Sequence, residues 1–391
     1  MRLTLDPELE AFRAEFGAFV DKHLPPEAQT WERSRSSSHV PEWARRWQRL
    51  QFDHGWLFPG HPREFGGRNA GLLAQYVHRD ELSRRRIYHC FNPQGVGIIA
   101  ASLLSFGTAE QKQNWAVPIL RADMTASLGM SEPGAGSDLA GLRTRAVLDD
   151  DYFVVNGQKV WTSGAHDADV LLTFVRTDPS APKHKGISAL LIRTDAPGVV
   201  CRPFPSVYDR DHLDFNEVFL TDVRVPVANL VGPLHGGWKV ANGSLGHERT
   251  MMWMNFANRL RDLLDDFRPA GAVQRDQYAT LAMDYQALRL LGSAALARAA
   301  RGERDVAAVS MLKLLGSEAE QNTARRAVDA AGSGGLVDPG MTAPYNAYGL
   351  DQYGASWFAR YAGSYAGTIA GGTSEIQRNI IAQQVLGLPR G

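Results

Sequence analysis

The stretch GMSEPGAGSD at residues 129–138 carries the strongest structural signal in this chain. It is polar and rich in glycine, so it predicts a loop that leaves several backbone N–H groups free close to a ligand. Further along comes NGQKVWTS at residues 156–163. Its Asn-Gly pair predicts a turn, and the alternation after it predicts a strand that presents Trp161 and Ser163 on one face. These two stretches predict a ligand-binding loop followed by a turn and a strand.

Length and composition place the chain among large globular proteins. It has 391 residues, of which 44% are hydrophobic and 21% charged, so two or three domains with a sizeable core are expected. Lys and Arg together number 42, and so do Asp and Glu. This balance gives no overall attraction to nucleic acid or to an anionic membrane, and no partner of either kind is expected.

Cysteine usage and the N-terminus indicate a reduced, intracellular setting. Cys90 and Cys201 are too few and too far apart for a disulfide framework, and no CxxC occurs. Residues 1–23 form an amphipathic pattern with Asp6 as N-cap and Pro7 at the first helical position, and contain no apolar signal core. The longest apolar stretch, residues 95–106, is too short to span a bilayer. We therefore expect a soluble, cytoplasmic protein.

The order along the chain is helical, then β, then helical. Residues 1 to about 120 show helical periodicity at 40–50 and 70–84, with a loop at 54–67 between them. Residues 125–230 carry short β-rich runs separated by Asp, Gly and Pro, and long helical patterns return from residue 236. The β runs are 152–155, 170–175, 187–192 and 217–220, and the later helices are 249–267, 278–300, 306–331 and 376–386.

Several chemistries have no supporting motif. No HxxxH, HExxH or Cys/His cluster occurs, so no metal site is expected. The glycines of GSGG at residues 332–335 do not form GxGxxG after a strand, and no GxxxxGK[ST] loop exists. This argues against nicotinamide and ATP binding.

Seven motifs in one order resemble the FAD-dependent acyl-CoA dehydrogenases over essentially the whole chain. Besides the two stretches above they are WLFP at 56–59, EFGG at 64–67, residues 178–188 from Asp-Pro to Lys-Gly-Ile-Ser, EVF with DVRVP across 217–226, and GGTSEIQRN at 371–379. The resemblance implies an α+β fold. An N-terminal helical domain (1–122) would precede a small β-barrel or sandwich (123–234), followed by a C-terminal four-helix-bundle-like domain (235–391).

The resemblance also implies which residues bind FAD. Trp161 would pack against the isoalloxazine ring, although a large aromatic residue is otherwise most often part of a core. Glu132 and Asp138 look like catalytic carboxylates, but in the family they fix the loop through hydrogen bonds. The remaining contacts implied are Leu128, Met130, Ser131 and Ser163 at the ring, Gly136 and Ser137 along the cofactor or the thioester tail, and Gly332, Gly334, Thr373 and Glu375 elsewhere on FAD.

The reaction implied is α,β-dehydrogenation of an acyl-CoA thioester, which needs a base in a dry pocket and donors at the thioester oxygen. The family's usual base position corresponds to Gly371, which cannot abstract a proton but whose N–H can still meet the thioester oxygen. Other members carry the Glu before an Arg on the first helix after the β domain, and here that site holds Glu248 and Arg249. We therefore expect Glu248 to be the base, oriented by Arg249. His247 points about 100° away around the helix and is not expected to take part.

Each of these assignments has a plainer alternative. Glu248 and Arg249 are also what a solvated helix surface looks like, and such pairs are common. The glycine pair at residues 371–372 is also a plain turn signal.

Two departures from the family pattern concern a neighbouring subunit's cofactor. The usual Arg-x-x-Phe-Gly run is absent from residues 265–278, where Arg268 and Arg275 both remain candidates to replace its Arg. Asp329 stands where members have Gln, and a carboxylate facing a pyrophosphate is unfavourable. We therefore expect either a homotetramer or a mixed α2β2 tetramer with a related chain.

The electron acceptor expected from the resemblance is an electron-transfer flavoprotein. Three other flavin reactions use the same fold and remain open: those of an acyl-CoA oxidase, a nitroalkane-type oxidase and a flavin monooxygenase. A cofactor-poor scaffolding subunit of a mixed dehydrogenase is the non-enzymatic alternative. The acyl group, whether straight, branched or sterol-derived, stays open.

Overall fold

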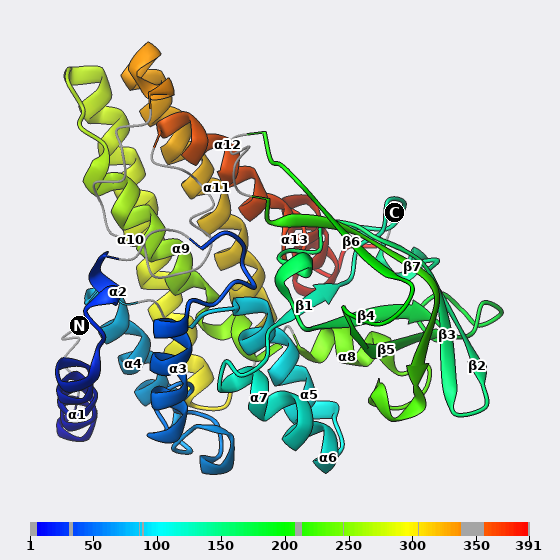
Figure 1. Ribbon diagram of the computed structural model, residues 1–391. Coiled ribbons are helices and arrows are strands. Elements are labelled where there is room, and N and C mark those ends of the chain that lie inside the picture. The colour runs from blue at the N-terminus through cyan, green and yellow to red at the C-terminus, as the bar shows by residue number, and fades with distance from the viewer. Residues whose placement is uncertain are drawn as a thin grey trace. The chain divides into compact units, whose positions relative to one another are not determined.

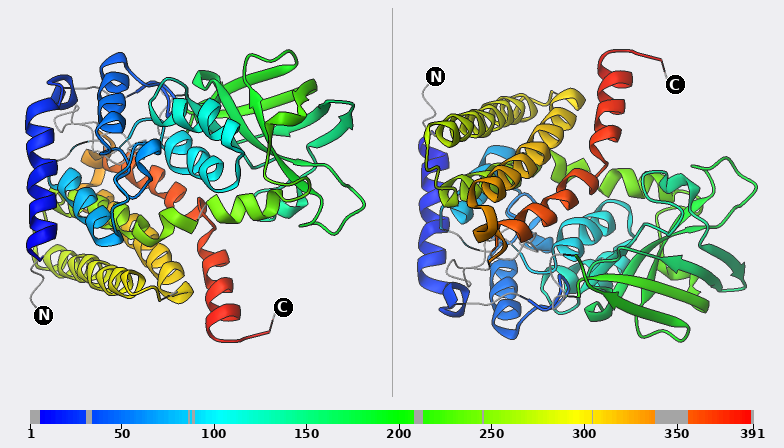
Figure 2. Two further views of the ribbon diagram at one scale, coloured as in Figure 1. Left: turned by 90° about the horizontal axis from the view of Figure 1, so that it is seen from below. Right: turned by 90° about the horizontal axis from the view of Figure 1, so that it is seen from above.

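The computed structural model describes residues 6–30, 34–85, 87, 90–207, 213–244, 246–303, 305–337 and 356–389. It divides into two units, each compact in itself (Figures 1 and 2). Unit 1 comprises residues 1–70, 87–206 and 210–246, and unit 2 comprises residues 71–86, 207–209 and 247–391.

Helix α1 (Pro7–His23) opens unit 1 and follows the sequence prediction. The Asp6 side chain caps it by accepting a hydrogen bond from the Leu9 N–H at 2.9 Å, and Pro7 takes the first helical position. Its buried face carries Phe16, Phe19 and Val20. The next elements are α2 (Glu27–Thr30), α3 (Glu42–Asp53) and a 3-10 turn, η1 (Arg63–Phe65).

The loop between α3 and residue 71 is closely packed, with Trp56 buried against Phe16. Gly66 has φ +75°, and a Cβ there would lie 2.3 Å from the Phe52 ring, so only glycine fits. The chain then re-enters unit 1 through η2 (Gly95–Ile99), α5 (Ala100–Phe106), α6 (Ala109–Gln111), η3 (Lys112–Ala116) and α7 (Val117–Leu120).

The β domain expected between two helical parts is confirmed as one sheet. Among the described residues its strand order is β6-β7-β3-β2-β4-β5-β8, with β1 running parallel to β4. The bounds are β1 Ala126–Gly129, β2 Arg145–Asp149, β3 Tyr152–Lys159, β4 Val170–Arg176, β5 Ile187–Arg193, β6 Val199–Phe204, β7 Phe215–Pro226 and β8 Leu230–Val231. The four β runs predicted from sequence lie in β3, β4, β5 and β7.

Strand β4 lies between two hydrophobic cores, which explains its continuous apolar run. Leu172 packs in one core with Leu103 and Leu120 from the helices. Its neighbour Leu171 points to the other core, with Val155 of β3 and Val218 of β7. The sheet therefore curls around a second core of its own. Helix α8 (Gly237–Ser244) follows the last strand within unit 1.

Unit 2 is helical, and α4 groups with it although it comes early in the chain. Its elements are α4 (Leu72–Arg84), α9 (Gly246–Asp266), α10 (Ala272–Ala300), α11 (Val306–Ala331), η7 (Gly332–Leu336), α12 (Trp357–Ile369), α13 (Ser374–Ile380) and η8 (Ile381–Val385). Helices α10, α11 and α12 pack beside one another (Figure 1). The main hydrophobic core of unit 2 includes Trp253 and Leu260 of α9, Leu288 of α10 and Leu312 of α11.

Two glycines allow close helix packing in this unit. A Cβ at Gly292 would lie 2.2 Å from the Trp253 ring, and one at Gly316 would lie 2.7 Å from Phe256. No helix that the structure describes is long and apolar enough to cross a membrane.

Candidate active site

The glycine-rich stretch follows β1 as a loop, as predicted, and is held from inside by Glu132. The Glu132 carboxylate accepts hydrogen bonds from the N–H of Arg143 at 2.6 Å, the N–H of Thr144 at 2.9 Å and the Lys159 ammonium at 2.8 Å. Burial raises the pKa of Glu132, but the charge and hydrogen bond of Lys159 and the hydrogen bonds of Thr144 and Arg143 outweigh it and leave the pKa below its ordinary value. Glu132 thus fixes the loop, as expected.

Lys159 is the other half of this anchor. Burial lowers the pKa of Lys159 to about 8, and the charge of Glu132 opposes that shift. The ammonium also donates to the Met130 carbonyl at 3.3 Å. The Ser131 carbonyl accepts from the Val160 N–H at 3.0 Å. The end of β3 therefore holds the first residues of the loop at two points.

The predicted turn at Asn156-Gly157 is wrong. Both residues lie inside β3, where the pairing with β7 passes from Val155–Val223 to Gly157–Leu220, so β7 carries one extra residue in a β-bulge opposite Asn156. The Asn156 side chain closes two hydrogen bonds of 2.9 Å with Asp222. A Cβ at Gly157 would lie 2.5 Å from Thr144 Oγ1, so glycine is required by close approach and not by a hairpin.

The prediction that Trp161 and Ser163 share one strand face is also wrong. Strand β3 ends at Lys159, and Trp161 has a left-handed backbone with φ +59°, which redirects the chain. Trp161 is 58% exposed, whereas Ser163 is buried. The Ser163 carbonyl accepts a hydrogen bond from the Ser127 hydroxyl at 2.6 Å, which ties it to β1.

Three side chains that the sequence did not single out hold β1 and this segment in place. Asn92 closes hydrogen bonds with the N–H and the carbonyl of Ala126, both at 2.8 Å, and Gln94 accepts from the Leu128 N–H at 3.1 Å. Asn216 donates to the Thr162 carbonyl at 3.1 Å. They come from segments distant in sequence, so no local pattern reveals them.

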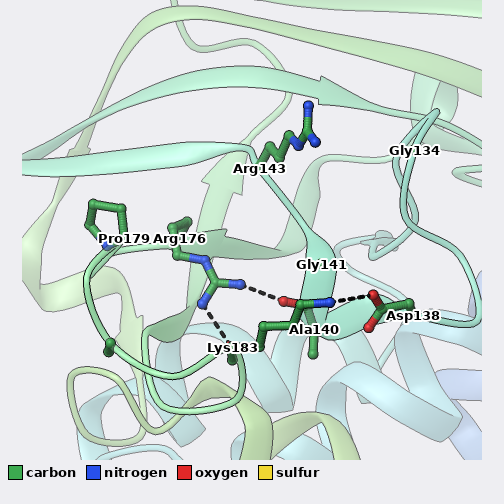
Figure 3. A pocket seen from close by; sticks show the side chains of 9 residues that line it. Gly134, Asp138, Ala140, Gly141, Arg143, Arg176, Pro179 and Lys183 are labelled. Atoms are coloured by element: carbon green, nitrogen blue, oxygen red, sulfur yellow. Dashed lines mark hydrogen bonds and ion pairs between the residues drawn. The ribbon is translucent and has the colours of Figure 1, made fainter.

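A hollow of about 370 Å³ opens beside the glycine-rich loop (Figure 3). Gly136 and Ser137 are exposed in that loop, between the lining residues Gly134 and Asp138. It is lined by Gly134, Asp138, Ala140, Gly141, Arg143, Arg176, Pro179, Ala181 and Lys183. Arg176 donates to the carbonyls of Ala140 at 2.6 Å and Lys183 at 2.7 Å, and Lys183 pairs with Asp138 at 3.0 Å. The exposed Arg143 guanidinium has no hydrogen bond or ion pair with any residue that the structure describes. The hollow thus carries the positive charges of Arg143, Arg176 and Lys183 and the negative charge of one carboxylate, Asp138. This excess of positive charge favours an anionic ligand.

The C-terminal motif in unit 2 forms a tight turn before α13. Gly371 and Gly372 have φ +69° and +96°, a conformation that favours glycine at both positions. Thr373 caps α13 by accepting from the Ile376 N–H at 3.2 Å, and Gln377 donates to the Gly371 carbonyl at 3.2 Å.

Three further residues predicted to contact FAD lie at or next to the ends of helices in unit 2. Glu375 is exposed in the first turn of α13, where hydrogen bonds from its own N–H and from Thr373 lower the pKa of its carboxyl. Gly332 ends α11 with φ +54°, and Gly334 follows in η7.

The predicted base lies where the structure gives only the backbone. Residues 247–249 belong to the first turns of α9, which confirms that Glu248 and Arg249 stand on a helix. Their side chains lie outside the described residues. The predicted site residues therefore fall into two groups, each within one unit. Those of unit 1 are Leu128, Met130, Ser131, Gly136, Ser137, Trp161 and Ser163, and those of unit 2 are Glu248, Arg249, Gly332, Gly334, Gly371, Thr373 and Glu375.

The residues of unit 1 fit a flat aromatic ligand such as the isoalloxazine of FAD. Trp161 offers an exposed ring beside a loop whose backbone is fixed, and Thr162 Oγ1 is buried without a hydrogen-bond partner among the described residues. The described residues contain no group of three or more His, Cys, Asp or Glu side chains arranged to hold a metal ion.

Comparison with known proteins gives one consistent result. Three family descriptions match in order: "Acyl-CoA dehydrogenase, N-terminal domain" over residues 6–123, "middle domain" over 127–223 and "C-terminal domain" over 235–386. The chain is 34% identical over 354 residues to acyl-CoA dehydrogenase IpdE1 of Mycobacterium tuberculosis, covering 88% of each. It is 32% identical to acyl-CoA dehydrogenase FadE26 of the same organism, covering 100% of this chain and 99% of FadE26.

Solved structures that are similar to this chain over its whole length agree with these matches. A structure described as "Tcur3481-Tcur3483 steroid ACAD" aligns with a TM-score of 0.81 at 31% identity and covers 100% of both chains. The ChsE4-ChsE5 complex from Mycobacterium tuberculosis aligns with a TM-score of 0.77 at 30% identity, again over 100% of both chains.

Proposed function

Because the chain belongs to the acyl-CoA dehydrogenase family, whose members are flavoproteins of fatty acid metabolism, we propose that it converts an acyl-CoA thioester to its trans-2-enoyl-CoA with FAD as cofactor. FAD, when bound, supplies the acceptor for the β-hydrogen. The observation that most supports this proposal is Trp161. Its ring is exposed, and its backbone is held in a left-handed conformation between the glycine-rich loop and β7.

Glu248 is the proposed base. Its carboxylate takes the proton from the substrate's α carbon, and Arg249 orients it. The family's usual base position holds Gly371, which has no carboxylate. Glu248 is therefore the one carboxylate assigned to this step. A carboxylate in a desolvated pocket has a raised pKa, which suits it to proton abstraction.

The Gly371 N–H is the proposed donor to the thioester oxygen, where negative charge develops as the α-proton leaves. The side chain that the family places here is absent, but glycine keeps its N–H. The turn at Gly371 and Gly372 is braced by Gln377, which donates to the Gly371 carbonyl. That brace supports a fixed direction for the neighbouring peptide groups.

The hollow beside the glycine-rich loop is the proposed binding place for the phosphates of CoA. Arg143 is its cation without a partner in the described chain, and Lys183 carries a second charge that Asp138 only partly offsets. Phosphate groups bind such clusters through charge-assisted hydrogen bonds. The acyl group is proposed to be bulky and ring-bearing, in line with the relative described as a steroid ACAD.

The proposed assembly is a mixed α2β2 tetramer with a related chain, and the proposed electron acceptor is an electron-transfer flavoprotein. Two similar structures are described by pairs of names, Tcur3481-Tcur3483 and ChsE4-ChsE5. In this chain, Asp329 and the missing Arg-x-x-Phe-Gly run weaken the contacts to a neighbour's cofactor. The same losses favour a cofactor-poor scaffolding subunit as the second candidate function.

The test is an anaerobic visible spectrum of the protein, purified alone and with a co-expressed related chain. Addition of acyl-CoAs with straight, branched and steroid-derived acyl groups should bleach the flavin bands with at least one of them. Admission of air then separates the reactions, since a dehydrogenase reoxidises slowly with ligand bound whereas an oxidase releases peroxide at once. A chain that carries no flavin in either preparation would contradict the enzyme and leave the scaffolding subunit.

A further inference from the structure

Three aromatic rings meet at one end of the sheet in unit 1. Phe204 ends β6 and Phe215 begins β7, and the two are direct cross-strand partners. Their ring centroids are 6.1 Å apart with the planes nearly parallel at 29°. Trp161 meets both rings edge-on, at 5.2 Å from Phe204 and 5.5 Å from Phe215, with interplanar angles of 73° and 84°. Edge-to-face pairs of this kind are attractive and directional.

The backbone at Trp161 is held as firmly as its ring. A φ of +59° is rare for a bulky residue and persists only where the surroundings impose it. On one side the Val160 N–H donates to the Ser131 carbonyl at 3.0 Å, and on the other the Thr162 N–H donates to the Asn216 carbonyl at 3.2 Å. Trp161 is thus fixed between the glycine-rich loop and β7.

The ring contacts cover only part of the indole. With 58% of Trp161 exposed, the two phenylalanine rings hold it while most of its surface stays open. Both phenylalanines are half-buried, so the strands and not the solvent set their positions. A large ring that is immobile yet exposed is arranged to pack against another flat group.

We infer that Phe204 and Phe215 are positioning residues: as a cross-strand pair they fix the plane of the Trp161 indole against which the isoalloxazine of FAD packs. This inference rests on the proposed function for the identity of the flat ligand. The fixing of Trp161 itself is a property of the chain without any ligand. Fixing the indole before binding spares the ordering cost at the moment FAD arrives.

The test uses the full chain with fluorotryptophan incorporated and follows the ¹⁹F line of Trp161, assigned by its loss in Trp161→Phe. Phe215→Leu and Phe204→Leu keep apolar bulk on the strands and guard against misfolding, and Phe215→Ala removes the contact. Phe219→Leu is the matched control, because Phe219 is also half-buried on β7 and contacts Arg202 instead. The ¹⁹F line of Trp161 should shift and narrow in the Phe204 and Phe215 variants, because the indole ring becomes more mobile. It should stay unchanged in the control.

The second readout is the FAD dissociation constant from flavin fluorescence. We expect it to rise about tenfold in Phe215→Ala, which corresponds to about 1.4 kcal/mol, with no change in the KM for acyl-CoA. An unchanged Trp161 line in the Phe204 and Phe215 variants would overturn the positioning role even if the enzyme is active. A shifted line with unchanged FAD affinity would overturn the link to FAD. Failure of the unaltered chain to bind FAD would instead count against the proposed function, while the ¹⁹F line would still decide whether the pair fixes Trp161.

Discussion

Lys159 and Glu132 form an ion pair of 2.8 Å in which only 1% and 7% of the two side chains are exposed. Lys159 ends strand β3 and Glu132 stands in the glycine-rich loop, so one buried contact joins the two stretches of sequence that identify the family. Two backbone N–H groups complete the shell of Glu132. The shape of the loop therefore depends on charges that face no ligand.

Replacing Glu132 by Gln should destabilise the fold strongly. The variant keeps the shape but leaves the Lys159 charge buried without its counterion, and breaking a buried pair in this way costs about 3–5 kcal/mol. Urea unfolding followed by circular dichroism would measure it. The matched control is Asp149→Asn, which breaks the exposed ion pair with Arg224 on the same sheet and should cost less than about 1 kcal/mol. Equal losses of unfolding free energy in the two variants would show that the Glu132–Lys159 pair does not anchor the loop.

The contribution of Glu132 should also depend on pH in one direction. Its pKa in the folded chain lies below the ordinary value, so its stabilisation is complete above the pKa of an unfolded glutamate, about 4.3, and is lost as the pH falls through the folded pKa. The stability difference between the unaltered chain and Glu132→Gln should shrink as the pH falls from about 5 to below about 4. A difference that grows over this acidic range would contradict this assignment.

Two helix glycines of unit 2 should respond oppositely to alanine. Alanine is the better helix former by about 1 kcal/mol. At Gly292 that gain should be outweighed, because the added Cβ would lie 2.2 Å from the Trp253 ring, and overpacking costs about 1–3 kcal/mol or more. At Gly367 the nearest atoms would be 3.8 Å away, an ordinary contact, so the substitution should be neutral or stabilising. Thermal unfolding of both variants tests the pair, and a stabilised Gly292→Ala would show that the helices are packed differently.

Arg143→Gln should weaken substrate binding without slowing the chemical step. Loss of one charge-assisted contact to phosphate is worth about tenfold in affinity, so the KM for acyl-CoA should rise by roughly that factor while kcat is kept. Arg145→Gln, two residues along and outside the hollow, is the control. Added salt should reduce the difference in KM for acyl-CoA between Arg143→Gln and the unaltered enzyme, because it screens the charge of Arg143. A fall in kcat at constant KM would contradict this assignment, because it would mean that Arg143 acts in the chemical step and not in substrate binding.

Local sequence patterns predict much of the fold, and the reason is visible in particular elements. Helix α11 runs over Val306–Ala331 as its apolar spacing indicates, and α1 begins at the Asp6 cap and Pro7. Strands β4 and β5 appear where continuous apolar runs stand, because both are buried on two sides. Each of these signals lies within the element that it forms.

The candidate site was harder to predict, because its supporting contacts are distant in sequence. The Asn-Gly pair looks like a hairpin turn, but it lies within β3 opposite a bulge of β7, and the glycine is needed there because Thr144 approaches closely. The phenylalanine pair beside Trp161 depends on the register of β6 and β7, which no local period encodes. Glu248 remains a prediction from the resemblance.

The role of Glu248 as the base is tested most directly by an anaerobic stopped-flow measurement of flavin bleaching. Glu248→Gln and the unaltered enzyme are both loaded with FAD and mixed with an acyl-CoA that the unaltered enzyme oxidises. The substitution keeps size and removes the base, and removal of a general base costs at least about 10²–10⁴-fold in rate. We expect the flavin of Glu248→Gln to stay oxidised over the time in which the flavin of the unaltered enzyme bleaches completely, with acyl-CoA still bound. Bleaching of Glu248→Gln at the unaltered rate would contradict this role and assign the α-proton to another group.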